Sequence, residues 1–387
     1  MKFSNLVPTV LAAGLVASLS GCLKDSNTTQ PTSIGGSATP LYDLGNAATV
    51  VDQLGHNVIL QTYLDLNTRI KVLNSACADL KAAPSQQKLD IAKQAWNDAR
   101  IPWESTESFL IGPVDALGID PQMDTWPLAV TDLQQVLHDQ PNITADQVRQ
   151  LDTNLRGFHT AEFLLFGDGV ASNNKALAAF QTSEFNYLVA VTGVMAQHTT
   201  TLVQAWTEHF DPDNAQSPSF IDVFTLHAGA QETGFASLPQ VLQTIIQDGM
   251  VAISGEVGDS KLATPLGADI ASANASLVES QFSWNSLTDF HNNVESIVHL
   301  YTGSYGERTG LGISALVKQS NPELDAEIIQ ALADAEAKIA AIAGPDGQMP
   351  FTRAIKDPAA RLRVQDAIDQ MHVLHRLLQD QLVKLVN

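Results

Sequence analysis

Apolar side chains recur at spacings of three and four residues through most of this chain, and no other feature restricts its fold as strongly. Two early series are Ile59, Tyr63, Leu66, Ile70, Leu73, Cys77 and Leu80, and then Leu89, Ala92, Trp96, Ala99 and Trp103. Comparable series cover residues 185–206, 221–250, 285–301, 322–342 and 357–386. No segment alternates convincingly between apolar and polar residues, as a half-buried strand would. We therefore predict an all-α fold.

A polar segment at residues 211–218, with prolines at both 212 and 218, interrupts this periodicity and is the best candidate for a domain boundary. Before it, residues 144–147 (Thr-Ala-Asp-Gln) have the form of a capping box, which predicts that a helix begins at residue 145. That helix would carry Val148, Leu151, Leu155, Phe158, Glu162 and Leu165. The sequence thus predicts two helical bundles packed side by side, residues 42–214 and residues 218–387.

The start of the chain is typical of an exported lipoprotein. Lys2 precedes an apolar stretch at residues 6–19, which is shorter than the about 20 residues that span a bilayer. Leu19-Ser20-Gly21-Cys22 has the form of a lipobox, so we interpret residues 1–21 as a signal peptide and Cys22 as the lipidated residue. The alternative is an ordinary signal peptide with a chance cysteine. Residues 22–41 are polar and flexible in composition, which predicts a tether.

This interpretation places the protein in the periplasm or on the cell surface, held by its lipid. Leu23, rather than Asp, follows Cys22, and under the sorting rule of enteric bacteria this favours the outer membrane. No second long apolar run is present, so the lipid anchor would be the only contact with a membrane.

Charge and cysteine content exclude several classes of partner and cofactor. A formal charge of −21 repels phosphate backbones, so nucleic acid is not expected as a partner. With Cys22 assigned to the lipid, Cys77 is left alone, which excludes an internal disulfide, a thiolate zinc site and an iron–sulfur cluster. Because Cys77 lies on an apolar helical stripe, we expect it in the core.

The sharpest chemical feature is Gly157-Phe158-His159-Thr160-Ala161-Glu162. His159 and Glu162 share one helix face, and Glu162 falls on the apolar stripe of that helix. A carboxylate that faces a core is costly unless it is paired, hydrogen-bonded or bound to a metal. Histidine and glutamate at this spacing form metal sites in helical bundles, but a satisfied polar pair is the alternative. Gly157 would let another segment approach closely.

A second cluster of charges precedes this motif. Arg100, Glu104 and Glu107 form one helical stripe beside Trp96 and Trp103, and Pro102 predicts a kink there. The stripe is either an exposed ion-pair ladder or a partly buried group that completes a metal site. The turn at residues 112–115 follows and ends in Asp115, which is a further candidate ligand.

A third polar segment, residues 282–290, includes Ser283 and leads into a predicted helix. Ser286 could cap this helix, whose inner face would carry Asp289 and Asn293. Two further pairs have the spacing of metal ligands, although ordinary polar helix faces are the alternative for both: His291 with Glu295, and His372 with His375.

Several catalytic motifs are absent from the sequence. It has no His-Glu-x-x-His or His-x-x-Glu-His helix, because Phe163 follows Glu162. It also lacks a Gly-x-Ser-x-Gly elbow, a Walker loop and a dinucleotide fingerprint. These absences do not exclude haem binding, since one histidine can serve as an axial ligand.

Taken together, the three segments resemble the imelysin-like family. Its Gly-x-His-x-x-Glu signature matches Gly157, His159 and Glu162; an earlier block resembles residues 100–115, and a later one residues 282–303. The resemblance implies a two-domain helical protein of the periplasm or outer membrane, tied to iron acquisition, with the motif near the groove between domains. Some members are classed as metallopeptidases. One departure is Trp284, where many relatives have histidine, which puts the full ligand set in doubt.

We therefore expect a binding protein for iron, another divalent metal or an iron complex, which it would exchange with an envelope iron-transport component. His159 and Glu162 would be ligands with Glu104, Glu107 and Asp115, while the surrounding cleft would be formed by Arg100, Gly157, Ser283, Asp289 and Asn293. Two alternatives stay open. One is a zinc metallopeptidase with Glu162 as ligand or general base, and the other is a structural protein without metal.

Overall fold

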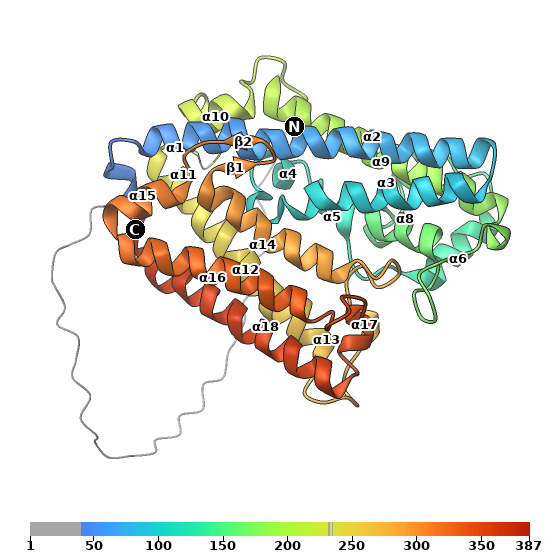
Figure 1. The fold of residues 1–387 in the computed structure, drawn as a ribbon. Coiled ribbons are helices and arrows are strands. Elements are labelled where there is room, and N and C mark those ends of the chain that lie inside the picture. Colours follow the sequence, from blue (N-terminus) through green and yellow to red (C-terminus); the bar gives the residue numbers. More distant parts are fainter. Residues whose placement is uncertain (1–39, 231–232, 234) are drawn as a thin grey trace, which may run out of the picture. The chain divides into compact units, whose positions relative to one another are not determined.

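Helices form nearly all of the regular structure in this computed structural model, which describes residues 40–230, 233 and 235–387 (Figure 1). The prediction of an all-α fold is confirmed. The predicted signal peptide, Cys22 and nearly all of the predicted tether lie outside the described residues. Within the described part, none of the helices combines the length and the apolar character needed to cross a bilayer.

The α-helices are α1 (Ala47–Gln53), α2 (Leu60–Ala82), α3 (Gln86–Glu104), α4 (Pro113–Ala116), α5 (Asp120–Asp124), α6 (Val130–Asp139), α7 (Ala145–Val148), α8 (Gly157–Phe166), α9 (Thr182–Thr207), α10 (Phe220–Leu226), α11 (Leu238–Gln243), α12 (Ala252–Gly255), α13 (Thr264–Leu266), α14 (Ser286–Thr302), α15 (Ile313–Ser320), α16 (Pro322–Ala341), α17 (Phe351–Ala354) and α18 (Pro358–Arg376). The 3₁₀ turns are η1 (Leu41–Asp43), η3 (Glu107–Phe109), η4 (Thr153–Leu155), η5 (Leu177–Ala179), η9 (Ala275–Leu277) and η11 (Val383–Leu385). Four π-helical segments are η2 (Leu54–Ile59), η7 (Thr244–Val251), η8 (Glu256–Ala263) and η10 (Leu377–Leu382). Strands β1 (Ser304–Tyr305) and β2 (Arg308–Thr309) form a short antiparallel hairpin.

Several long helices begin at a side chain that caps them. The side chains of Ser85, Asn321 and Asp357 accept hydrogen bonds from backbone amides in the first turns of α3, α16 and α18. In α16 and α18 the cap is followed by proline, whose missing amide hydrogen costs nothing at this position. These starts agree with the series predicted near residues 89, 322 and 357.

Helix α3 continues through Pro102 and ends two residues later. Proline cannot donate a hydrogen bond to the carbonyl four residues earlier, which belongs to Asp98. The Nη1 of Arg69 on α2 donates to that carbonyl oxygen instead, at 3.3 Å. A side chain on the neighbouring helix therefore satisfies the group that the proline leaves free.

Two predicted helices are wrong in extent. The capping box at Thr144 is present, but α7 ends at Val148, and α8 begins only at Gly157. Gly157 has φ +75°, so the backbone turns there although the apolar spacing continues through the break. The predicted helix over 221–250 is likewise interrupted between α10 and α11, and helical structure then continues past 250 to Leu266.

The helices pack in two groups. In the first, α2 packs against α3 and α9, and α8 packs against α3 and α9; in the second, α16 packs against α14 and α18 (Figure 1). Helix α14 also contacts α3, so the groups meet along these two helices. The described residues form one compact unit by their contacts, and the division at residues 214–218 stays a prediction. Cys77 is buried in the core as expected.

Candidate metal centre

Arg100 on α3 is the centre of a buried network of charges. Its Nη1 pairs with Oδ1 of Asp124, and its Nη2 pairs with Glu104, with Glu279 at 3.2 Å and with Asp289 at 3.0 Å. The side chains of Arg100, Glu104 and Asp289 are fully buried. The stripe beside the tryptophans is thus an interior network and not an exposed ladder. One guanidinium joins carboxylates from α3, α5, α14 and the loop before α14.

His159 lies beside this network and is held by Glu162. The Nδ1 of His159 donates to Oε2 of Glu162 at 3.0 Å, within the same helix. The other carboxylate oxygen of Glu162 accepts from the amide and the hydroxyl of Ser283, at 2.7 and 2.8 Å. Both oxygens of Glu162 are therefore engaged. This arrangement fixes the imidazole ring and directs its Nε2 away from Glu162, as a carboxylate does behind many metal-binding histidines.

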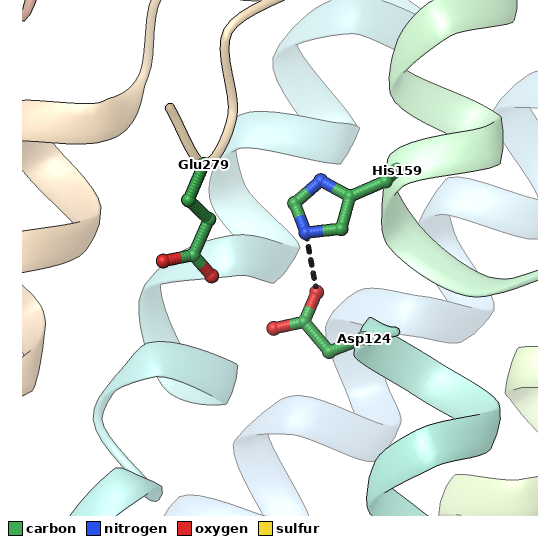
Figure 2. Close-up of side chains that lie close together, drawn as sticks. All are labelled: Asp124, His159 and Glu279. Carbon is green, nitrogen blue, oxygen red and sulfur yellow. Dashed lines mark ion pairs between the residues drawn. The ribbon is translucent and has the colours of Figure 1, made fainter. Parts of the chain in front are cut away.

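The free edge of His159 faces Asp124 and Glu279 (Figure 2). The buried Nε2 lies 3.2 Å from Oδ1 of Asp124 and forms an ion pair with it when the ring is protonated. One potential ligand atom from each of the three residues lies within 4.8 Å of the other two. Figure 2 shows that the three side chains come from three separate segments and point toward one another. One imidazole and two carboxylates form a donor set suited to iron, zinc or manganese.

Two backbone features bring these segments together. A Cβ atom on Gly157 would lie 2.1 Å from the carbonyl oxygen of Met123, so only glycine lets α8 begin against the end of α5. In the loop before α14, Ser280 and Trp284 have φ values of +49° and +65°, which residues other than glycine rarely adopt. The loop folds back at these residues and places Glu279 and Ser283 on the site.

Carboxylates outnumber basic side chains in this interior. Arg100 and Lys261 pair with four carboxylates, whereas a fifth, that of Glu162, pairs with His159; the four belong to Glu104, Asp124, Glu279 and Asp289. Burial raises the pKa of Glu104 far above its ordinary value and also raises the pKa of Asp289. Although burial alone would raise the pKa of Glu279, the charges of Lys261 and Arg100 lower it. Because the pKa of Asp124 is also lowered and that of His159 is raised, the proton that a cation would displace from the three facing groups is the one on His159.

A pocket of about 330 Å³ reaches this site from outside. Asp124 and Glu279 form part of its wall together with Trp126, whose ring packs against that of His159 at 4.8 Å. The remaining walls include three further carboxylates and one cation, those of Glu107, Asp120, Glu256 and Lys261. Burial and then the charge of Asp124 raise the pKa of Asp120 to about 6. An acidic entrance of this kind attracts cations and repels anions.

The structure gathers most of the residues singled out in the sequence. Gly157, Ser283 and Asp289 contact the site as described above. Asn293 donates to Oε2 of Glu104 at 2.6 Å, and Glu107 forms a second group with Glu104 and Asp124. Sequence reasoning missed Asp124 and Glu279, which lie in a five-residue helix and in a loop, outside any periodic pattern.

Asp115 and Trp284 are placed elsewhere. Asp115 is exposed on α4 and lines a different pocket together with Asp248. The Nε1 of Trp284 donates to the carbonyl oxygen of Gly169 at 2.7 Å, and Arg353 lies over its ring. A histidine at position 284 is therefore not needed for the set formed by Asp124, His159 and Glu279.

His372 and His375 do not form a joint site with each other. His372 contacts Asp259 at 2.8 Å, whereas His375 contacts the hydroxyl of Ser254 at 3.0 Å. The alternative of an ordinary polar helix face fits these two residues.

The protonation of His159 predicts how the stability of the metal-free protein changes with pH. Burial lowers the pKa of His159, but the charge of Asp124 and the contacts of the ring with the carboxylates of Asp124 and Glu162 together outweigh it and raise the pKa to about 9, from 6.5. The resulting stabilisation is complete below pH 6.5 and is lost as the pH rises to about 9. It amounts to at most about 3 kcal/mol. We expect the free energy of unfolding in chelator to fall more steeply over this range for wild type than for His159→Gln.

Urea unfolding at several pH values measures this difference. His138→Gln is the control, because His138 is exposed and also lies beside a carboxylate, that of Asp139 at 2.8 Å. Its curve should run parallel to wild type. Parallel curves for His159→Gln and wild type would show that His159 gains no proton affinity on folding.

The chain belongs to the imelysin family, whose sequence model matches residues 59–378. It is 27% identical over 330 residues to iron-regulated protein A of Synechococcus elongatus, covering 85% of this chain and 84% of that protein. The predicted resemblance is confirmed.

Two solved structures share the fold. The crystal structure of an iron-regulated protein A precursor from Parabacteroides distasonis matches with a TM-score of 0.72 and 27% identity, covering 90% of this chain and 98% of that one. The crystal structure of an imelysin-like protein from Psychrobacter arcticum matches with a TM-score of 0.66 and 16% identity, covering 88% and 96%. The second match supports the fold alone.

Proposed function

We propose that this protein is a lipid-anchored envelope protein that binds a divalent metal ion, with iron as the cargo, for iron acquisition. Asp124, His159 and Glu279 would hold the ion, and Glu162 would orient His159. The observation that carries the proposal is the buried Nε2 of His159, which lies 3.2 Å from Oδ1 of Asp124 and shares one ligand cluster with the carboxylate of Glu279. The name of the relative from Synechococcus elongatus, an iron-regulated protein, supports iron as the metal.

The charge balance supports a divalent ion in particular. Neighbouring cations lower the pKa values of Asp124 and Glu279, so these two carboxylates stay ionised and together offer two negative charges to a divalent ion. Hard carboxylate oxygens with one imidazole suit iron(II) better than copper. The predicted lipobox at Cys22 supports location at the envelope, and an outer-membrane anchor is part of the proposal.

A metallopeptidase is the second function that the family name raises. Such an enzyme needs a general base free to take a proton from water. Both oxygens of Glu162 are already bonded, to His159 and to Ser283, so Glu162 is not free for that role. This geometry favours metal binding over peptide hydrolysis.

Metal content tests the proposed function. The mature protein, purified without a histidine tag, is loaded anaerobically with iron(II) and its bound metal is measured by mass spectrometry. We expect His159→Ala and Glu279→Gln each to lose one equivalent of tightly bound metal relative to wild type, because each loses one of three ligands. His138→Ala, which removes an exposed histidine, should keep the wild-type content.

Equal metal content in wild type and His159→Ala would show that Asp124, His159 and Glu279 form a structural polar network and not a metal site. Cleavage of an unfolded protein by the loaded wild type, if abolished by chelator and by His159→Ala, would establish the peptidase instead. Absence of cleavage with retained metal is the result that we expect.

A further inference from the structure

The outer side of α14 carries a second group of potential metal ligands. His291 follows Asp289 by two residues, which is about 200° around a helix, so it lies on the face opposite Asp289 and Asn293. Glu295 and His299 continue this face at spacings of four residues. Helix α16 packs beside α14 and contributes Glu336 (Figure 1).

These side chains are close enough to share one ion. Nε2 of His291 lies 3.8 Å from Oε1 of Glu295, and Nδ1 of His299 lies 3.8 Å from Oε2 of Glu295. Ligand atoms of His291, Glu295 and Glu336 all lie within 4.8 Å of one another. The three residues are half-buried, which leaves solvent access on one side. Two packed helices hold them, so little ordering is needed for binding.

Neither carboxylate of this group pairs with a lysine or an arginine in the described part of the chain. The ion pairs described for Glu295 are with the two histidines alone, and Oε1 of Glu336 is buried without a hydrogen-bond partner. Burial and then the charge of Glu295 raise the pKa of Glu336 to about 7. The unpartnered oxygen of Glu336 thus lies beside a second carboxylate and an imidazole, where a cation can bind.

We propose that His291, Glu295 and Glu336 form a second metal site, which binds a divalent first-row transition ion such as Zn²⁺. His299, which lies beside Glu295, would orient the carboxylate of Glu295. One imidazole nitrogen and two carboxylate oxygens are three ligands, and the exposed side leaves room for water as a fourth. The site shares no residue with Asp124, His159 and Glu279. It therefore stands whether or not the buried site binds iron.

Zinc titration in a His159→Ala background tests this site apart from the buried one. We expect this variant still to bind Zn²⁺, and the added substitutions Glu336→Gln and His291→Ala each to weaken binding at least about tenfold. Even the loss of a residue behind a ligand costs about 10- to 100-fold in metal affinity. Asp259→Asn is the matched control, because it removes a carboxylate beside a single histidine, His372, at 2.8 Å.

Cobalt(II) provides a direct signature of the ligands. The visible absorption of Co²⁺ in the His159→Ala protein should change when His291 is replaced by Ala and should stay the same in Asp259→Asn. Thermal unfolding confirms that each variant is folded. Zinc affinity and cobalt absorption that Glu336→Gln and His291→Ala both leave unchanged would overturn the second site. Failure of the buried site would appear separately, as equal iron content in wild type and His159→Ala.

Discussion

Replacing Arg100 with alanine is expected to destabilise the protein by about 3–5 kcal/mol, the cost of leaving a buried ion pair without one partner. We expect a loss of stability at the upper end of this range because the guanidinium pairs with four carboxylates, those of Glu104, Asp124, Glu279 and Asp289. Without it, these groups must take up protons or admit water. Urea unfolding at neutral pH in the presence of chelator measures the change.

Lys338→Ala is the control, since Lys338 pairs with Asp366 at 3.6 Å and both side chains are exposed. Exposed ion pairs contribute at most about 1 kcal/mol, so this variant should stay close to wild type. If Arg100→Ala does not accumulate as a folded protein, Arg100→Lys keeps the charge but lacks the planar fork, and should lie between the two. An Arg100→Ala protein as stable as Lys338→Ala would contradict a central role for Arg100.

Gly157→Ala is the second large effect that we expect, with a loss of roughly 2–5 kcal/mol. A left-handed backbone costs a residue with Cβ about 1–2 kcal/mol, and forced overpacking costs about 1–3 kcal/mol more. The new Cβ would lie 2.1 Å from the carbonyl oxygen of Met123, which is backbone and cannot rotate away. Since Asp124 follows Met123 directly, the displacement should also weaken metal retention.

Gly118→Ala separates the cost of a left-handed backbone from the cost of overpacking. Gly118 has φ +58°, but nothing lies within 4 Å of the position of its Cβ. This variant should therefore lose only about 1–2 kcal/mol and keep its metal. Similar losses of stability and of metal for Gly157→Ala and Gly118→Ala would show that backbone strain alone, and not the contact with α5, explains the glycine of the motif.

Much of the fold was predictable because the long helices have clear apolar periods and capping residues. The periodicity failed where it continued across a turn, as at Gly157, whose positive φ depends on a contact with Met123 that is remote in sequence. It also missed the hairpin of β1 and β2, since strands of two residues are too short to show alternation.

The site was predictable to the extent that its residues lie on regular helices. The stripe of Arg100 and Glu104 beside tryptophans indicated burial, and Asp289 was expected on an inner face. Asp124 and Glu279 had no such signal, because tertiary contacts alone place their short helix and loop. Asp115 shows the converse: it is near the other residues in sequence, yet it faces a different pocket.

The contacts of Arg100 with Glu279 and Asp289 join positions 179 and 189 residues apart along the chain. A partly synthesised or unfolded chain therefore contains the motif around His159 but not the site. Contacts between such distant residues form late, after the helices themselves. Ions present while the chain refolds should consequently leave the rate of helix formation unchanged, and capture should follow the docking of α14 onto α3.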